Sequence, residues 1–355
     1  MNKTKIEWTD YSWPIINGCR RKSAGCESCY AERLAATRLA QTEKYKGLAV
    51  MTPNGPRWTG ETRLWEPALQ EPLRLKKPSR IFVADMGDLF YEGVNDEDID
   101  KVFAVMALCP QHTFQVLTKR AERMRDYFCN REGWIRLTTK LFETVSERGL
   151  DEMLLLDCTF EDNERSIVRV PLKNVWLGVS CEDQKTADER IPWLLRTPAA
   201  VRWVSYEPAL GPVNFVGIRD ANTRVTRGAY LGPCLHADDV GGLYETLGLD
   251  WIVCGGESGP GARPMHPDWA RSARDQCVAV GVPFFFKQHG AWMETDAVPG
   301  GDLGGDMRRD IVRIVKPCGE PDGHFRRGDA LMRRVGKHAA GRLLDGREWN
   351  EYPNL

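Results

Sequence analysis

The chain has no long apolar run and no leader pattern. None of its apolar runs approaches the roughly 20 residues that a helix needs to span a bilayer, although hydrophobic residues make up 42% of the 355 positions. The N-terminus also has no signal-peptide pattern. We therefore expect a cytoplasmic protein with no membrane partner.

A strong net charge is missing as well. The 49 basic and 50 acidic residues leave a formal net charge of −1, so composition gives no global sign of nucleic-acid binding, and a polyanion would have to meet a local patch. The six histidines show no metal-ligand spacing. The glycine-rich stretch Gly255–Gly259 is neither a P-loop nor a nucleophile elbow, because no Lys-Ser/Thr pair ends it and Pro260 stands where G-x-S-x-G needs glycine.

Cysteine, by contrast, is abundant. The chain has eleven cysteines, which in the absence of a secretory signal indicate thiols and metal ligands in a reducing compartment. Three of them, Cys19, Cys26 and Cys29, follow the spacing C-x6-C-x2-C. Thiolates select iron-sulfur clusters, zinc or copper(I). A closed zinc site needs four ligands, whereas a 4Fe-4S cluster on three thiolates keeps one iron open; zinc stays an alternative, with Cys254 as a ligand that the fold could bring near.

Short apolar segments alternate with helical ones along most of the chain. We expect strands at Pro14–Ile16, Arg80–Ala84, Thr113–Leu117, Asn174–Val179, Val201–Ser205, Asp250–Cys254 and Val282–Phe286, and helices at Tyr30–Thr42, Asp98–Leu108, Gln184–Leu195 and Asp268–Val280. Apolar strands that alternate with helices favour a parallel sheet buried on both faces. This periodicity alone does not separate an open doubly wound sheet from a barrel, or one large domain from two smaller ones.

Four segments interrupt or follow this pattern. Lys44–Pro78 is rich in proline and is either a lid or a surface loop with one short helix. Asn130–Arg169 is predicted to be a mostly helical insertion, and Asp220–Leu249 an inserted loop. Met332–Leu344 has a helical pattern within a basic tail, which either contacts phosphates or is a solvated face. The basic residues of this tail are Arg326, Arg327, Arg333, Arg334, Lys337, His338 and Arg342.

Several motifs support a family resemblance. They are Lys5–Trp13, Tyr30–Glu32, Met86–Phe90, Leu117–Arg120, Gly178–Ser180, Glu207–Pro208, Gly255–Pro264, Phe285–Gln288 and Leu343–Trp349. With the three cysteines, these motifs resemble a phage-associated three-cysteine family that is similar to radical S-adenosylmethionine (radical SAM) enzymes. The chain departs from ordinary radical SAM enzymes in two ways: six residues instead of three separate Cys19 from Cys26, and Ser28 replaces the aromatic residue that usually precedes the third cysteine.

The resemblance implies a fold and two cofactors. The fold is an α/β, partial (β/α) TIM-like barrel of the radical SAM type over residues 1–290, with insertions at about 130–170 and 220–249. A C-terminal basic extension, residues 291–355, would pack on the barrel. The cofactors are a 4Fe-4S cluster on Cys19, Cys26 and Cys29, and SAM. Arg20, Arg21 and Lys22 inside the ligand loop either tune the cluster or face solvent.

Polar and sulfur residues follow the predicted strands, where the active sites of parallel barrels lie. The resemblance assigns SAM's amino group to Gly255, Gly256 and Glu257, with contact to substrate as the alternative for Glu257. The other candidates are Asp85 and Asp88 for the amino group, and Ser180, Glu182 and Glu207 for the ribose hydroxyls. Cys181, Cys254 and Tyr206 are candidate hydrogen-atom donors, with small apolar filler as the alternative role of the two cysteines.

The implied activity is radical chemistry on nucleic acid. A 5′-deoxyadenosyl radical would rearrange (isomerise) a modified thymidine in phage DNA, as a step of DNA hypermodification in the host cytoplasm. The expected partners are DNA or a modified nucleotide and an electron donor such as flavodoxin or ferredoxin. Two alternatives remain: a zinc or iron-sulfur nucleic-acid-binding module without radical chemistry, and a DNA lesion lyase similar to spore photoproduct lyase, which needs a hydrogen-donating cysteine.

Overall fold

The computed structural model describes residues 1–151, 153, 155, 159–162, 165–168, 170–218, 234–237, 243–246, 248–295, 312–319 and 326–354. The chain forms two compact units. The first unit contains Met1–Lys22, Cys29–Val179 and Trp193–Arg202, and the second contains Ser23–Ser28, Ser180–Pro192 and Trp203–Leu355. Within the described ranges, no helix is long and apolar enough to cross a bilayer.

Parallel strands form the centre of the first unit. They lie in the order β1 (Asn2–Lys3), β2 (Tyr11–Trp13), β7 (Arg80–Val83), β8 (Thr113–Thr118) and β11 (Val175–Ser180). Only β1 is antiparallel to its neighbour. The first expected strand is shifted, since pairing ends at Trp13 and resumes in β3 (Ile16–Asn17). Pro14 lies between the two strands and has no N–H to donate to a ladder.

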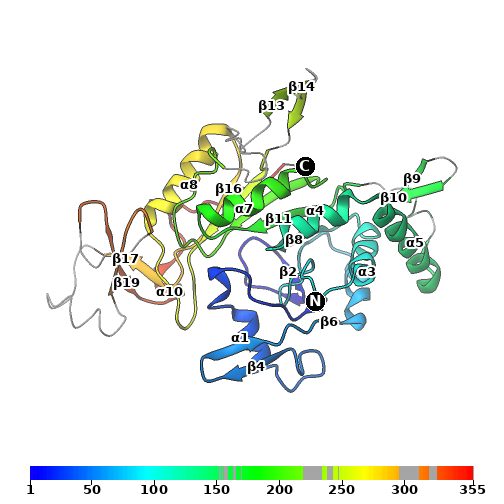
Figure 1. The fold of residues 1–355 in the computed structure, drawn as a ribbon, viewed down its shortest axis with the longest axis horizontal. Helices are drawn as coiled ribbons and strands as arrows, with labels where there is room; N and C mark the ends of the chain where they lie inside the picture. Colours follow the sequence, from blue (N-terminus) through cyan, green and yellow to red (C-terminus); the bar gives the residue numbers. More distant parts are fainter. Residues whose placement is uncertain are drawn as a thin grey trace. The chain divides into compact units, whose positions relative to one another are not determined.

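Three helices of this unit pack together, two of them through aromatic side chains. They are α3 (Asp96–Ala107), α4 (Ala121–Cys129) and α5 (Arg131–Arg148), and α3 lies beside α5 (Figure 1). Phe103 stacks with Tyr127 and meets Phe128 edge-on. The expected insertion after Asn130 begins with α5 and has helical residues as far as Leu155, but it ends in the hairpin β9 (Thr159–Asp162) and β10 (Arg165–Val168).

The segment after the cysteines builds a small α/β layer. Helix α1 (Tyr30–Ala36) is shorter than expected, because Thr37 leaves the helical conformation. It packs on the hairpin β4 (Ala49–Thr52) and β5 (Gly55–Trp58) (Figure 1). Then follow β6 (Arg63–Leu64), which pairs with β3, the 3₁₀ helix η2 (Glu66–Gln70) and α2 (Glu71–Arg74). The proline-rich Lys44–Pro78 is therefore mostly structured.

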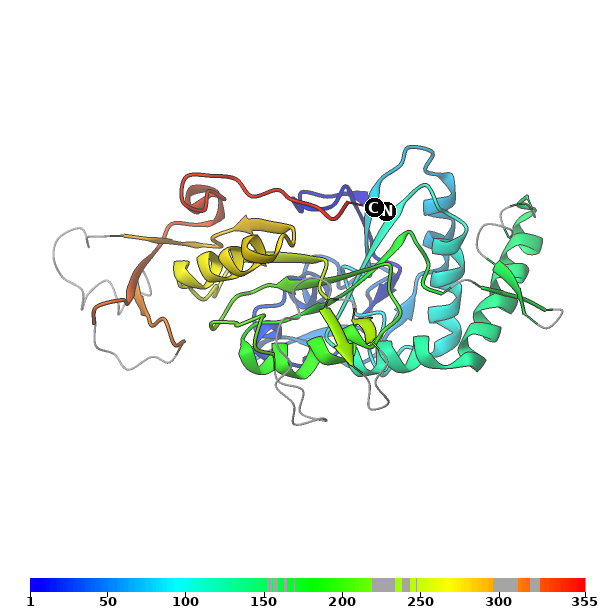
Figure 2. The ribbon, with the colours of Figure 1, turned by 90° about the horizontal axis from the view of Figure 1, so that it is seen from above.

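Parallel strands also form the centre of the second unit. Strands β12 (Val201–Tyr206), β15 (Trp251–Gly255) and β16 (Phe284–Gln288) lie in that order. Trp203 packs on Trp251 across the ladder. Helix α8 (Pro267–Val280) packs on β15 and β16 (Figure 2), and α7 (Gln184–Leu195) precedes β12. Every residue of β12 and β15 is buried, as expected for parallel strands of mainly apolar composition.

Two small sheets complete the second unit. Strands β17 (Trp292–Glu294), β19 (Ala330–Arg334) and β18 (Val312–Val315) form an antiparallel sheet in that order. The prediction of a helix at Met332–Leu344 is wrong. The segment begins in β19, and only α10 (Lys337–Ala340), which lies between Gly336 and Gly341, is helical. Strands β13 (Cys234–Ala237) and β14 (Leu243–Thr246) are paired; the rest of the predicted insertion at about 220–249 lies largely outside the described residues.

The mixed α/β class is confirmed. Among the described residues, the first unit has a run of five strands and the second a run of three. A partial barrel remains a prediction, as do its extent over residues 1–290 and the separate extension after it.

Candidate functional site

The three predicted metal ligands lie in short irregular segments. Cys19 follows β3, Cys26 ends the 3₁₀ turn Ala24–Cys26, and Cys29 is the N-cap of α1. All three are partly exposed, and none forms a disulfide bond with a described residue. In the part of the chain that the structure covers, no three Cys, His, Asp or Glu side chains are gathered to hold a metal ion. The thiols fit an iron-sulfur cluster in donor type.

Cys19 is held in place by its neighbours in the first unit. Gly18 has φ +91°, and a Cβ there would lie 2.2 Å from the Glu61 carbonyl oxygen, so this position requires glycine. Its N–H donates to the Met86 carbonyl at 3.1 Å. Arg120 donates from Nη1 to the Cys19 sulfur at 3.7 Å and from Nη2 to the Arg20 carbonyl at 2.7 Å. A guanidinium beside the sulfur favours the thiolate, the form that binds metals.

Asp88 orients this arginine. Its buried carboxylate accepts from the Thr118 hydroxyl at 2.6 Å and from the backbone N–H groups of Phe90 and Lys119 at 3.0 Å each. Arg120 Nη1 donates to the same carboxylate at 3.2 Å. Asp88 thus already accepts hydrogen bonds within the first unit. Its predicted contact with SAM would have to replace at least one of them.

Asp85 has a different environment. It follows Ala84, whose φ of 57° is uncommon for a residue other than glycine and marks local strain. Its Oδ1 is buried and has no hydrogen-bond partner in the described structure. Burial raises the pKa of this carboxyl to about 6, although a hydrogen bond from Ser12 and the charge of Lys44 oppose the shift. Asp85 is therefore a predicted site residue with an open acceptor for a ligand's donor.

Glu257 lies at the end of the second unit's central strand and pairs with an arginine. Arg263 donates from Nε to Oε2 at 2.9 Å and from Nη2 to Oε1 at 2.8 Å, and its backbone N–H also reaches Oε2 at 2.8 Å. The same guanidinium reaches Glu27 Oε2 at 3.0 Å and the Ala24 carbonyl at 2.8 Å. The predicted partner of SAM's amino group is thus connected to the segment that carries Cys26.

Glu182, which follows β11 in the sequence, has a similar connection. Its fully buried carboxylate accepts from Arg190 Nη1 at 3.1 Å and from the Ser23 hydroxyl at 2.8 Å. Arg190 also donates to the Ser180 carbonyl at 2.6 Å, which fixes the strand end. A Cβ on Gly25 would lie 2.4 Å from Glu182 Oε1. The structure thus brings Glu182, Glu257 and the Cys26 segment together in one unit.

Glu207 and the two glycines form the neighbouring part of this strand-end region. Glu207 Oε1 pairs with Lys287 Nζ at 3.0 Å, and a Cβ on Gly255 would lie 2.6 Å from Oε1. A Cβ on Gly256 would lie 2.1 Å from the His289 carbonyl oxygen. The glycines therefore allow the backbone and the carboxylate to approach closely, an effect that needs no ligand.

The candidate hydrogen-atom donors are buried. Cys181, Cys254 and Tyr206 have essentially no exposed surface. The Tyr206 hydroxyl donates to the Gly211 carbonyl, and burial raises the pKa of both Tyr206 and Cys254 well above their usual ranges. Ser180 is also buried. Tyr206 and Cys254 are therefore neutral at physiological pH, and a role of these residues and Cys181 in hydrogen transfer stays a prediction.

Sequence reasoning assigned no role to three arginines that organise these sites. The sequence marks Arg120 only as one of the polar residues that follow the strands and Arg263 only as part of a motif of the resemblance, and Arg190 lies in no motif. A signal existed for Arg190 and Arg263, since they lie eight and six residues after Glu182 and Glu257. The basic tail is partly exposed and has some of its own contacts, such as Arg334 Nη2 with the Gly259 carbonyl at 3.0 Å.

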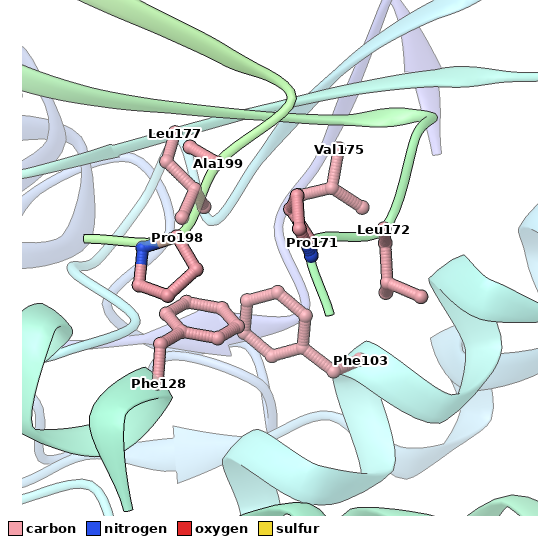
Figure 3. A pocket seen from close by; sticks show the side chains of 8 residues that line it. All are labelled: Phe103, Phe128, Pro171, Leu172, Val175, Leu177, Pro198 and Ala199. Atoms are coloured by element: carbon pink, nitrogen blue, oxygen red, sulfur yellow. The ribbon is translucent and has the colours of Figure 1, made fainter. Parts of the chain in front are cut away.

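A small pocket of about 10 Å³ lies elsewhere in the first unit, with Phe103, Phe128, Leu172 and Val175 among its lining residues (Figure 3). Its lining is apolar and contains none of the predicted site residues. It therefore offers no group for acid, base or metal chemistry.

Comparison with known proteins gives a family without an activity. A family model described as "Protein of unknown function (DUF5131)" matches residues 3–353. No curated protein matches the sequence. Among solved structures, a chitinase from Rhizomucor miehei aligns with 73% of this chain and 72% of its own, at 11% identity and a TM-score of 0.23. A likeness that weak supports no conclusion about fold or function.

Proposed function

The chain belongs to the DUF5131 family, whose function is unknown, and from its own residues we propose that it is a radical SAM enzyme. The observation that carries the proposal is the loop with Cys19, Cys26 and Cys29, three partly exposed cysteines in the spacing C-x6-C-x2-C. Three thiolates would hold a 4Fe-4S cluster with one open iron. When bound, the cluster would pass one electron to SAM, which splits into methionine and a 5′-deoxyadenosyl radical.

The chain's own residues would hold and orient the reactants. Arg120 would stabilise the Cys19 thiolate, and the buried strand ends of both units would keep water away from each set of polar groups. Asp85 has an open buried acceptor, Oδ1, that suits the amino group of SAM or substrate. Each of these roles is inferred from contacts within one unit.

The proposed substrate is a modified thymidine in phage DNA. The reaction would be an isomerisation: the radical takes a hydrogen atom from carbon next to nitrogen, the substituent migrates, and a hydrogen atom returns. Atoms and electrons balance if 5′-deoxyadenosine keeps the hydrogen atom and is released. A flavodoxin or ferredoxin would supply the initial electron and then a second electron which, with a proton from solvent, gives the product radical its hydrogen atom. The basic tail supports a polyanionic substrate, since Arg326, Arg327 and Lys337 are exposed.

Metal content and SAM cleavage test the proposal. Protein purified without oxygen should contain about four irons and sulfides per chain, with a broad visible absorption band. With SAM, reductant and hypermodified phage DNA it should form 5′-deoxyadenosine. The triple variant Cys19→Ala, Cys26→Ala, Cys29→Ala should lose both properties. The control Cys129→Ala, Cys318→Ala, which removes two exposed cysteines, should keep them.

Other results would favour the alternatives. One zinc per chain and no visible band would refute the radical mechanism and favour a binding module. A cluster that cleaves SAM but gives a repaired base, with product lost in Cys181→Ala or Cys254→Ala, would favour a lesion lyase. Absence of 5′-deoxyadenosine with every modified DNA would refute the proposed activity.

A further inference from the structure

The segment Ser23–Ser28 carries Cys26 and is tied at two points to buried carboxylates of its own unit. It contains one short 3₁₀ turn, Ala24–Cys26, with backbone bonds from Cys26 N–H to the Ser23 carbonyl at 2.9 Å and from Glu27 N–H to the Ala24 carbonyl at 3.1 Å. So short a turn is weak by itself. Its position must therefore depend on side chains from the strand ends.

Arg263 makes one of the two ties. Its guanidinium holds both oxygens of Glu257, at 2.8 and 2.9 Å, and spans to the Ala24 carbonyl at 2.8 Å and Glu27 Oε2 at 3.0 Å. Glu257 is 7% exposed, so the pair is poorly screened by solvent and rigid. Only a planar fork with several donors can satisfy a carboxylate and a carbonyl together, a task for which lysine is poorly suited.

Glu182 makes the second tie. It accepts from the Ser23 hydroxyl at 2.8 Å while Arg190 fixes its other oxygen at 3.1 Å. Gly25 packs directly on this carboxylate, with no room for a side chain. Glu182 therefore binds the start of this segment at Ser23, and Arg263 binds it further along, at Ala24 and Glu27.

We propose that Arg263 is a positioning residue, which fixes the Cys26 segment by joining Glu257 to Ala24 and Glu27 and so presents the Cys26 thiol to the metal. The inference rests on the proposed function for the identity of the metal, but the anchoring itself concerns only this chain. Glu257 then acts on the cysteine segment through Arg263, a role that the sequence did not suggest.

Hydrogen exchange on metal-free protein tests the anchoring. In Arg263→Gln, the amides of Cys26 and Glu27 should exchange about tenfold faster or more than in the wild type, because charge-assisted bonds that order the turn are lost. Arg263→Lys should show an intermediate effect. The control Arg271→Gln removes an arginine with ion pairs to Asp268 and Asp345 on the same unit, and it should leave these amides unchanged.

Iron retention tests the consequence for the metal. In reconstituted protein, a chelator should remove iron about tenfold faster from Arg263→Gln than from the wild type or Arg271→Gln, and the electron paramagnetic resonance spectrum of the reduced cluster should broaden.

Two outcomes would overturn the inference: unchanged exchange at Cys26 and Glu27, or faster exchange with wild-type iron retention. If the wild type itself binds no iron-sulfur cluster, the proposed function fails, and the exchange comparison still decides whether Arg263 anchors the segment.

Discussion

Asp85 is the predicted site residue whose chemistry depends most directly on burial. A carboxyl with a pKa raised from 3.8 to about 6 binds its proton more tightly in the folded than in the unfolded chain. The folded state is therefore favoured below about pH 4, and this advantage is lost as the pH rises to about 6. A shift of this size corresponds to at most ~3 kcal/mol.

Asp85→Asn should remove this pH dependence, because asparagine resembles the neutral carboxyl. Between about pH 4 and pH 6, the free energy of unfolding of the wild type should fall relative to that of Asp85→Asn by up to ~3 kcal/mol. Urea unfolding at four pH values measures it. Asp126→Asn, at an exposed site, is the control. Parallel profiles for the wild type and Asp85→Asn would show that the pKa of Asp85 is not raised.

Residue types at the sites could be predicted, but their pairing could not. The sequence places Glu182 and Glu257 after apolar strands, so their position at strand ends follows from the pattern. Ser23 lies 159 residues before Glu182 in the chain, and no local signal brings them together. Arg263 is close to Glu257 in sequence, yet its contact with Ala24 depends on the fold. Partners supplied by tertiary structure are what the sequence leaves out.

The predicted elements succeed where hydrophobic periodicity is strong. The α7 helix was predicted at its observed ends, and each predicted strand from Arg80 onward overlaps an observed one. Errors occur where periodicity is ambiguous. Ala330 and Met332 are buried at alternate positions of β19, as expected for a strand. The charged residues that follow make this two-residue period hard to recognise in the sequence. Basic residues spaced through a short strand and a short helix look like one amphipathic helix.

Helix α5 gives a prediction at this scale, because adjacent residues face opposite ways. Leu141 is 0% exposed and Phe142 is 41% exposed. Leu141→Ala should lower the free energy of unfolding by ~2–4 kcal/mol, since it leaves a cavity where α5 faces its neighbours. Phe142→Ala removes a larger side chain but should cost less than ~1 kcal/mol. Urea denaturation followed by circular dichroism measures both; equal losses would contradict the assigned face of α5.

At the scale of the whole molecule, the chain passes repeatedly between its two units. The second unit takes Ser23–Ser28 and Ser180–Pro192 from within the stretch that otherwise builds the first. The division assigns Cys19 and Cys29 to one unit and Cys26 to the other.

This interleaving predicts how fragments behave. A fragment of residues 1–202 contains the whole first unit, but it leaves Ser180–Pro192 without the rest of the second. Glu182, Ala187 and Ile191, all fully buried in the intact chain, would then face water, with Glu182 and Arg190 as an uncovered ion pair. We expect the fragment to aggregate or to unfold without cooperativity, whereas the full chain should unfold cooperatively. Thermal unfolding and gel filtration of the fragment and of the full chain test this expectation. A monomeric fragment that unfolds as sharply as the full chain would show that the first unit folds alone.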